Sequence, residues 1–222
     1  MPTASRPAAL TDLFLVIAVL VGVKQALLPY STLYAGPAST LSAMILATFL
    51  LRRRGSSWAA LGLRRPESWK RTLGLTVLVF VLMLLTAAGA RGVAELFFED
   101  IGTSGRFDFV VGNLAGYLLI MVLVWTHSAF FEELLFRAFI ITKGSEAMGK
   151  GRLAMGAAVV LAAIFFGYRH FYYQGMHGAL ITGAIGLTFG IYYVVSGRRN
   201  IWPLILAHGL VNSIGQTSRF LG

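Results

Sequence analysis

Two adjacent glutamates stand within an apolar stretch of the chain. Glu132 and Glu133 follow two phenylalanines, and of the nine acidic residues only this pair lies deep in an apolar run. Glu133 and Arg137 are four residues apart with the acid first, which favours an ion pair on one helical face. Glu132 points about 100° away and has no partner on its own helix. An unpaired carboxylate in a low-dielectric site can act as a general base or acid, so we assign Glu132 a chemical role and Glu133 a structural one.

Histidines supply the second chemical element. His208 and Asn212 are also four residues apart, so their side chains are expected side by side, where two donors could hold a developing oxyanion. His170 lies near the end of another apolar run and could share a proton or a water molecule with Glu132. Each of these polar groups could instead only bridge packed helices.

The composition indicates a membrane protein. Of the 222 residues, 57% are hydrophobic and 13% are charged, whereas soluble domains carry about 25% charged residues. Several apolar runs are long enough to cross a bilayer, which takes about 17–25 residues. Cysteine is absent, which excludes disulfides, thiolate nucleophiles and thiolate metal sites. The net charge of +10 does not indicate nucleic-acid binding, because the chain has no basic soluble domain.

The apolar runs predict an all-α, polytopic transmembrane bundle of seven spans, forming a single integral membrane domain over residues 1–222. The first span lacks a cleavage site, so we expect it to be retained. The fourth run has about 34 residues, or roughly 50 Å of helix, and either forms one helix or breaks near Thr126 to give eight spans. No proline or glycine lies between Tyr117 and Lys143, which favours one helix. The expected spans are Leu10–Leu28, Ala38–Leu51, Thr72–Ala90, Phe109–Thr142, Leu153–Tyr173, Gly178–Val195 and Ile201–Phe220.

The charges predict an orientation. Positively charged connections stay in the cytoplasm, so we expect the arginine-rich connection and the amino terminus on the cytoplasmic side. We also expect this connection to contact anionic lipids. The alanine, glycine and arginine content is typical of a prokaryote, so we expect the bacterial cytoplasmic membrane. The basic residues of this connection are Arg52, Arg53, Arg54, Arg64, Arg65, Lys70 and Arg71. Seven spans put further basic residues on the same side: Lys143, Lys150, Arg152, Arg198 and Arg199. The acidic group falls outside: Glu95, Glu99, Asp100 and Asp108.

This arrangement creates a problem of register. Glu132 lies toward the cytoplasmic end of its helix, whereas His170 lies near the far end of the next. For the two to meet, the fourth helix must project into the cytoplasm or the fifth must be offset. His127 and His177 stand at expected span ends, and we interpret both as interfacial. Three glycines in the sixth span predict a close helix contact: Gly183, Gly186 and Gly190.

Three short motifs occur in order along the chain. They are Glu-Glu-x-x-x-Arg at Glu132–Arg137, Phe-x-x-x-His at Phe166–His170, and His-x-x-x-Asn at His208–Asn212. The ordered set resembles the CPBP family of intramembrane endopeptidases, which includes the type II CAAX prenyl endopeptidases and bacterial Abi proteins. The resemblance covers about residues 118–213, the expected peptidase core.

The resemblance implies an intramembrane protease of the glutamic type. Glu132 and His170 would activate water, and His208 and Asn212 would stabilise the oxyanion, with the second glutamate and the arginine of the first motif in support. Glu132, His170 and His208 could also be three zinc ligands, but we expect no cofactor. Arg169, directly before the middle histidine, is an unusually charged neighbour for the family.

The expected function is therefore cleavage of a peptide bond in a membrane-anchored or lipidated protein or peptide. Two alternatives remain. One is a catalytically silent immunity or binding protein on the same scaffold. The other is a proton-coupled transporter that uses Glu132 and the histidines as a relay, although the internal repeats typical of transporters are not visible. The sequence predicts membrane lipids as partners, no nucleic acid, and no particular oligomeric state.

Overall fold

The computed structural model describes residues 5–102 and 105–222, and within them helices are the only regular secondary structure. The all-α prediction is therefore confirmed for these residues. Two short 3₁₀ turns, Trp58–Leu61 and Asp108–Val110, lie in the connections. The helices are α1 (Arg6–Leu27), α2 (Ala35–Arg53), α3 (Trp69–Ala94), α4 (Leu114–Leu123), α5 (Ile141–Met148), α6 (Arg152–Tyr168), α7 (Phe171–Val195) and α8 (Trp202–Leu221).

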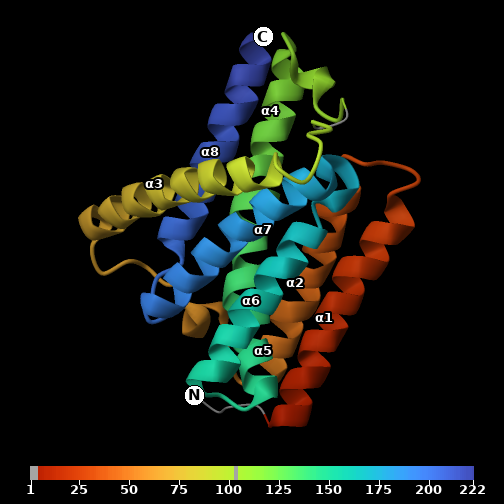
Figure 1. Cartoon of the computed structure of the whole chain (residues 1–222). Helices are drawn as coiled ribbons and strands as arrows, with labels where there is room; N and C mark the ends of the chain where they lie inside the picture. Colours follow the sequence, from red (N-terminus) through yellow and green to blue (C-terminus); the bar gives the residue numbers. More distant parts are fainter. Residues whose placement is uncertain (1–4, 103–104) are drawn as a thin grey trace.

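One continuous helix of 35 residues, Leu114–Met148, runs through the molecule (Figure 1). Between α4 and α5 it contains two π-helical segments, Val124–Phe131 and Glu133–Ile140. In a π turn the backbone hydrogen bonds skip one residue more than in an α-helix, and such turns concentrate at functional sites. The helix therefore widens near Thr126 but stays continuous, whereas the eight-span alternative required a break there.

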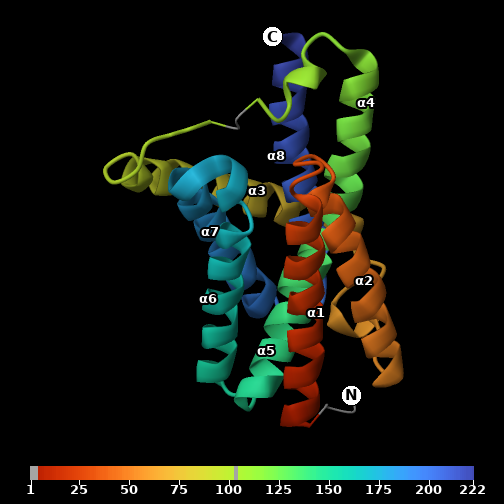
Figure 2. The same cartoon turned by 90° about the vertical axis from the view of Figure 1, so that its right-hand side faces the viewer.

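The other helices surround this long helix at two levels. At the level of α5, the long helix contacts α1 and α6. At the level of α4, it pairs with α8, and these two project beyond α1, α2 and α6 at the carboxy-terminal end (Figure 2). Helix α3 crosses the bundle at a steep angle and packs against α7 and α8 (Figure 1).

Five helical stretches are long and apolar enough to cross a membrane, which supports a transmembrane protein. Seven crossings are not confirmed. Helix α6 has only 17 residues, and α8 is not among the five because polar residues such as Asn212 and Gln216 lower its hydropathy. The five stretches are α1, α2, α3, α7 and the long helix Leu114–Met148.

The apolar core contains one acidic residue that the sequence analysis placed among the shallow ones. Asp12 on α1 is fully buried, and its carboxylate lies 3.0 Å from Arg54 Nη2 and 3.8 Å from Lys143 Nζ. By accepting hydrogen bonds from Arg54, Asp12 raises the pKa of that guanidinium. The expectation that only Glu132 and Glu133 lie deep was wrong. Asp12 can be buried because Arg54 and Lys143 neutralise it, and the sequence does not show this because both cations come from distant segments.

Helix α7 contains a kink that places the α6–α7 connection. Gly175 adopts φ 62° and ψ −167°, so the first turn of α7 is set at an angle to the rest. A side chain there would be strained, since positive φ favours glycine, and it would also meet Ile101. From the sequence we expected the fifth span to continue to Tyr173, but α6 ends at Tyr168.

Candidate active site

A cavity of about 370 Å³ lies between the long helix, α7 and α8. Its lining includes all four residues that the sequence assigned to chemistry: Glu132, His170, His208 and Asn212. They come from three separated parts of the chain: the middle of the long helix, the α6–α7 connection and α8. The structure thus brings the three motifs together around one space.

Glu132 lies at the junction of the two π-helical segments and is 5% exposed. Its Oε1 is 3.6 Å from Nε2 of His127, whose Nδ1 is 2.6 Å from Oγ1 of Thr40 on α2. The interfacial interpretation of His127 was wrong, because the widened helix turns this side chain toward the cavity. His177 is also buried, with Nδ1 3.7 Å from Asp100 Oδ1.

Glu133 is fully buried and has two partners. Its Oε2 is 3.2 Å from Arg137 Nε, so the predicted ion pair is present. Its Oε1 is 2.7 Å from His208 Nδ1 on α8. The pair with Arg137 is not aligned as a hydrogen bond, and within the described residues the three guanidinium nitrogens find no acceptor. Instead, the guanidinium lies over the ring of Phe166 at 4.3 Å.

His170 lies in the connection between α6 and α7, directly after the last turn of α6. Its Nδ1 is 2.7 Å from the carbonyl oxygen of Phe166, and its ring meets the Phe166 ring edge-on. Nδ1 therefore donates to the backbone, which leaves Nε2 as the available acceptor. Within the described residues no direct hydrogen bond joins His170 to Glu132, although both line the cavity.

His208 and Asn212 lie one turn apart on α8, and both line the cavity. Helix α8 approaches the long helix closely at Gly209, where an added Cβ would lie 2.5 Å from the Trp125 ring. Only glycine fits this crossing without moving the indole. The close approach is what brings His208 within hydrogen-bonding distance of Glu133.

The structure also resolves the register problem. Glu132 is 16 residues before the end of α5, and His170 is 18 residues after the start of α6. At 1.5 Å per residue both stand roughly 25 Å from the turn that joins α5 to α6. The long helix does project, but its excess length is α4, at the end opposite the arginine-rich connection (Figure 2). Glu132 and His170 therefore reach one level without a projection of the long helix at its arginine-rich end.

Comparison with known proteins gives a match to a family model. Residues 114–214 match the family model described as "Type II CAAX prenyl endopeptidase Rce1-like". Over these residues, which make up less than half of the chain, the protein is similar to the Rce1-like type II CAAX prenyl endopeptidases. No curated protein matches the chain, and no solved structure matches it.

Residues 114–214, which match this family model, include the four residues that the sequence predicted to be catalytic. Part of the cavity wall comes from outside this range. Lys24 of α1 lines the cavity, donates a hydrogen bond to the carbonyl oxygen of Arg169, and lies 3.8 Å from the centre of the Tyr172 ring. Arg169 in turn donates to Leu20 O at 2.7 Å and to Ser39 Oγ at 2.9 Å. These contacts fasten the residue before His170 to α1 and α2.

Sequence reasoning assigned no role to Lys24 and noted Arg169 only as an unusual neighbour. A lysine inside an apolar run was the available signal, because such a residue needs a partner. No spacing rule could name that partner 145 residues away. A metal site is a separate question: within the described residues no group of three or more histidine, aspartate or glutamate side chains could hold a metal ion.

Proposed function

We propose that this protein is an intramembrane endopeptidase in which Glu132 and His170 activate water while His208 and Asn212 stabilise the oxyanion. The observation that carries the proposal is the single cavity lined by all four side chains. The match of residues 114–214 to the Rce1-like family model supports protease activity in general.

The first step is attack of water on the scissile carbonyl carbon. The Glu132 carboxylate takes one proton from the water as the new carbon–oxygen bond forms, and Nε2 of His170 accepts a hydrogen bond that orients the water. When the carbon–nitrogen bond breaks, the proton on Glu132 passes to the leaving amine. A carboxylate that is 5% exposed suits this role, because little bulk water competes for its proton.

The tetrahedral intermediate places a negative charge on the former carbonyl oxygen. Asn212 can donate one hydrogen bond to it, and His208 the other. Since Nδ1 of His208 faces Glu133, a second donor at Nε2 requires the doubly protonated ring. The Glu133 carboxylate lies 2.7 Å from Nδ1 of this ring, so Glu133 acts as a positioning residue for His208 in addition to pairing with Arg137.

The substrate that we propose is a membrane-anchored protein or peptide, cleaved near the membrane surface. The family model is described as a CAAX prenyl endopeptidase, so a prenylated chain is the first substrate to test. We further propose that the protein lies in the bacterial cytoplasmic membrane with its amino terminus and arginine-rich end in the cytoplasm, and that no metal takes part.

The test compares the wild-type protein with Glu132→Gln in lipid vesicles. The reporter is a membrane-anchored peptide with a cleavable fluorophore, made with and without a prenyl group. We expect Glu132→Gln to lose at least about 10²-fold in turnover, the range of a removed general base, while wild-type activity survives treatment with a strong chelator.

The matched control is Glu95→Gln, which removes a carboxylate whose side chain is 57% exposed and far from the cavity lining. It should cleave as the wild type does. Equal cleavage by wild type and Glu132→Gln would contradict the proposal, and so would a biological activity that survives Glu132→Gln, which is what a silent immunity protein predicts.

A further inference from the structure

A second and larger cavity, of about 590 Å³, lies at the other end of the molecule. Its wall is built from the end of α2, the connection that follows it, the α5–α6 turn and the α7–α8 loop. Two contacts hold the loops in place: Ile201 N donates to Gly62 O at 3.2 Å, and Trp202 Nε1 donates to Arg64 O at 3.0 Å. The cavity is therefore a fixed part of the fold.

The lining of this cavity is strongly cationic. Glu146 is the one acidic residue among the described residues that form it. Two of the cations are neutralised, since Arg54 pairs with Asp12 at 3.0 Å and Lys143 pairs with Glu146 at 3.0 Å. The others form no ion pair within the described residues: Arg64, Lys150, Arg152, Arg198 and Arg199.

The amino terminus of α6 adds positive potential to the same wall. Gly151 is its N-cap and offers no capping side chain, and no acidic residue stands in the first turn. The first N–H groups of a helix carry a partial positive charge and bind anions such as phosphate. Both Gly151 and Arg152 line the cavity, so an anion there would meet the helix end and the cations together.

Two of the cations stand in an uncommon backbone conformation. Lys150 has φ 60° and Arg198 has φ 56°, and within the described residues they are the only non-glycine residues with positive φ. This left-handed conformation is unfavourable for residues other than glycine, asparagine and aspartate. Both residues lie in turns at the rim of the cavity. The fold therefore keeps two cationic residues in an unfavourable backbone conformation around the same cavity.

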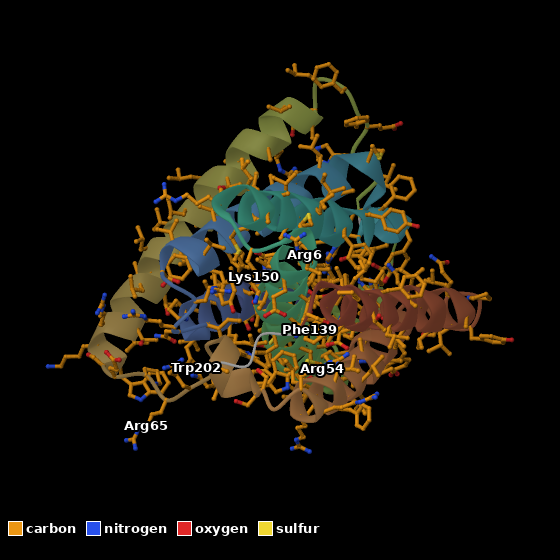
Figure 3. The ribbon with its side chains drawn as sticks, turned by 90° about the horizontal axis from the view of Figure 1, so that it is seen from below. Arg6, Arg54, Arg65, Phe139, Lys150 and Trp202 are labelled. Atoms are coloured by element: carbon orange, nitrogen blue, oxygen red, sulfur yellow. The ribbon has the colours of Figure 1, made fainter. Side chains whose placement is uncertain are left out.

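The residues near the cavity include types that are common at the level of lipid headgroups. Trp202 donates to the carbonyl oxygen of Arg64, which lines the cavity, and its ring packs against that of Trp69 at 6.0 Å. Tryptophan is enriched where a membrane meets water. Leu153, which follows Arg152, is 91% exposed and offers an apolar surface next to the cations. Seen from this end, Arg6, Arg54 and Lys150 gather around the end of the long helix (Figure 3).

We propose that this cavity binds the phosphate of an anionic phospholipid headgroup, with the acyl chains lying along the apolar surface beside α6. A phosphate supplies the negative charge that the five unpaired cations lack, and the neighbouring leucine and tryptophans favour a lipid over a soluble phosphate. The site is separate from the candidate active site, so it does not depend on the proposed protease activity.

The test measures binding of short-chain phosphatidylglycerol to the purified full chain in detergent, by native mass spectrometry and by the rise in unfolding temperature. Phosphatidylcholine and inorganic phosphate are measured in parallel. We expect phosphatidylglycerol to bind at least about tenfold more tightly than phosphatidylcholine, and inorganic phosphate not to displace it at equal concentration. Displacement by inorganic phosphate would overturn the lipid assignment, and equal binding of both lipids would overturn the site.

The variant Arg152→Gln/Arg199→Gln removes two of the unpaired cations and should weaken phosphatidylglycerol binding by at least about tenfold, because each cation near the membrane surface adds to the attraction of anionic lipid. The charge-matched control is Arg52→Gln/Arg65→Gln, since neither residue lines the cavity and Arg65 points away at the edge (Figure 3). Equal weakening in both double variants would show a general charge effect and overturn the proposal.

A second variant guards against loss of folding. Lys150→Asn/Arg198→Asn removes two charges while placing at both positions a residue that tolerates positive φ. It should keep the unfolding temperature of the wild type without lipid and weaken phosphatidylglycerol binding by a similar factor. Unchanged binding in this variant would contradict the site. Glu132→Gln should bind the lipid as the wild type does, so the failure of one proposal leaves the other standing.

Discussion

Glu133 stands between two functional groups. One of its oxygens faces Arg137 at 3.2 Å and the other faces His208 Nδ1 at 2.7 Å, and the whole side chain is buried. Arg137 is 2% exposed and finds no hydrogen-bond acceptor among the described residues. The carboxylate is therefore the main compensation for a buried guanidinium, and at the same time it orients a proposed oxyanion donor.

Replacing Glu133 by glutamine should destabilise the protein. The amide oxygen can still accept from His208, but Arg137 becomes a buried charge without a counter-ion, which costs about 3–5 kcal/mol. The measurement is chemical or thermal unfolding in detergent. The double variant Glu133→Gln/Arg137→Met should recover most of the lost stability, because it removes the unpaired charge.

The same double variant separates the two roles of Glu133. The glutamine amide can still accept from Nδ1 of His208, so if the negative charge of Glu133 is needed beside His208, turnover stays low even where stability returns, and KM changes little. Recovery of both stability and turnover would instead show that Glu133 acts only through Arg137. A stable Glu133→Gln single variant would contradict the burial argument itself.

The sequence could predict half of this arrangement. The contact of Glu133 with Arg137 follows from a spacing of four on one helix, a local rule. The contact with His208 spans 75 residues and depends on how closely α8 approaches the long helix. That approach is set by a glycine whose packing partner, Trp125, is not visible from spacing alone.

At the scale of elements, the α6–α7 crossing positions His170. An added Cβ on Gly167 would lie 2.5 Å from Ala179 O and 3.1 Å from Gly183 Cα. The glycine spacing in the sixth span predicted such a contact, and the structure confirms it for α6 against α7. Backbone meets backbone here, so no side chain can rotate away to make room.

Gly167→Ala should therefore push α6 and α7 apart. Overpacking of this kind costs about 1–3 kcal/mol, and it should displace Phe166 and His170, which lie on either side of the substituted residue in the chain. We expect a lower unfolding temperature and a loss of cleavage of about tenfold or more, measured with the vesicle reporter.

Gly156→Ala is the matched control on the same helix. No atom lies within 4 Å of the added Cβ, and alanine favours the helix by about 0.5–1 kcal/mol over glycine. This variant should be as stable as the wild type or slightly more stable, with unchanged cleavage. Equal behaviour of the two alanine variants would contradict a special role for the crossing at Gly167.

The sequence predicted the continuity of the long helix but not its π-helical turns. The absence of proline and glycine between Tyr117 and Lys143 predicted a continuous helix, and the structure has one. Its π-helical turns could not be predicted, because a period near 3.6 was assumed throughout the run. The widened turns are what bring His127 beside Glu132, so the error about His127 follows from that assumption.

At the scale of the whole molecule, charge is segregated along the bundle. Basic residues from the α2–α3 connection, the α5–α6 turn and the α7–α8 loop converge around the larger cavity. The sequence predicted that these groups share a side, because charge follows the positive-inside rule whatever the packing. It could not determine the number of crossings, because α6 is short and α8 carries polar residues, such as Asn212 and Gln216, that line the smaller cavity.

Single-cysteine labelling tests the orientation, since the chain has no cysteine of its own. Lys143 is 4% exposed and would resist any reagent, so Lys150, an exposed residue of the α5–α6 turn, is the better position. Cysteines at Lys150 and Arg65 should react from the cytoplasmic side in intact cells only with a permeant reagent. A cysteine at Glu99, which is exposed after α3, should also react with an impermeant one. Labelling of positions 65 and 150 from opposite sides would contradict the arrangement, because both lie at the cationic end of the same bundle.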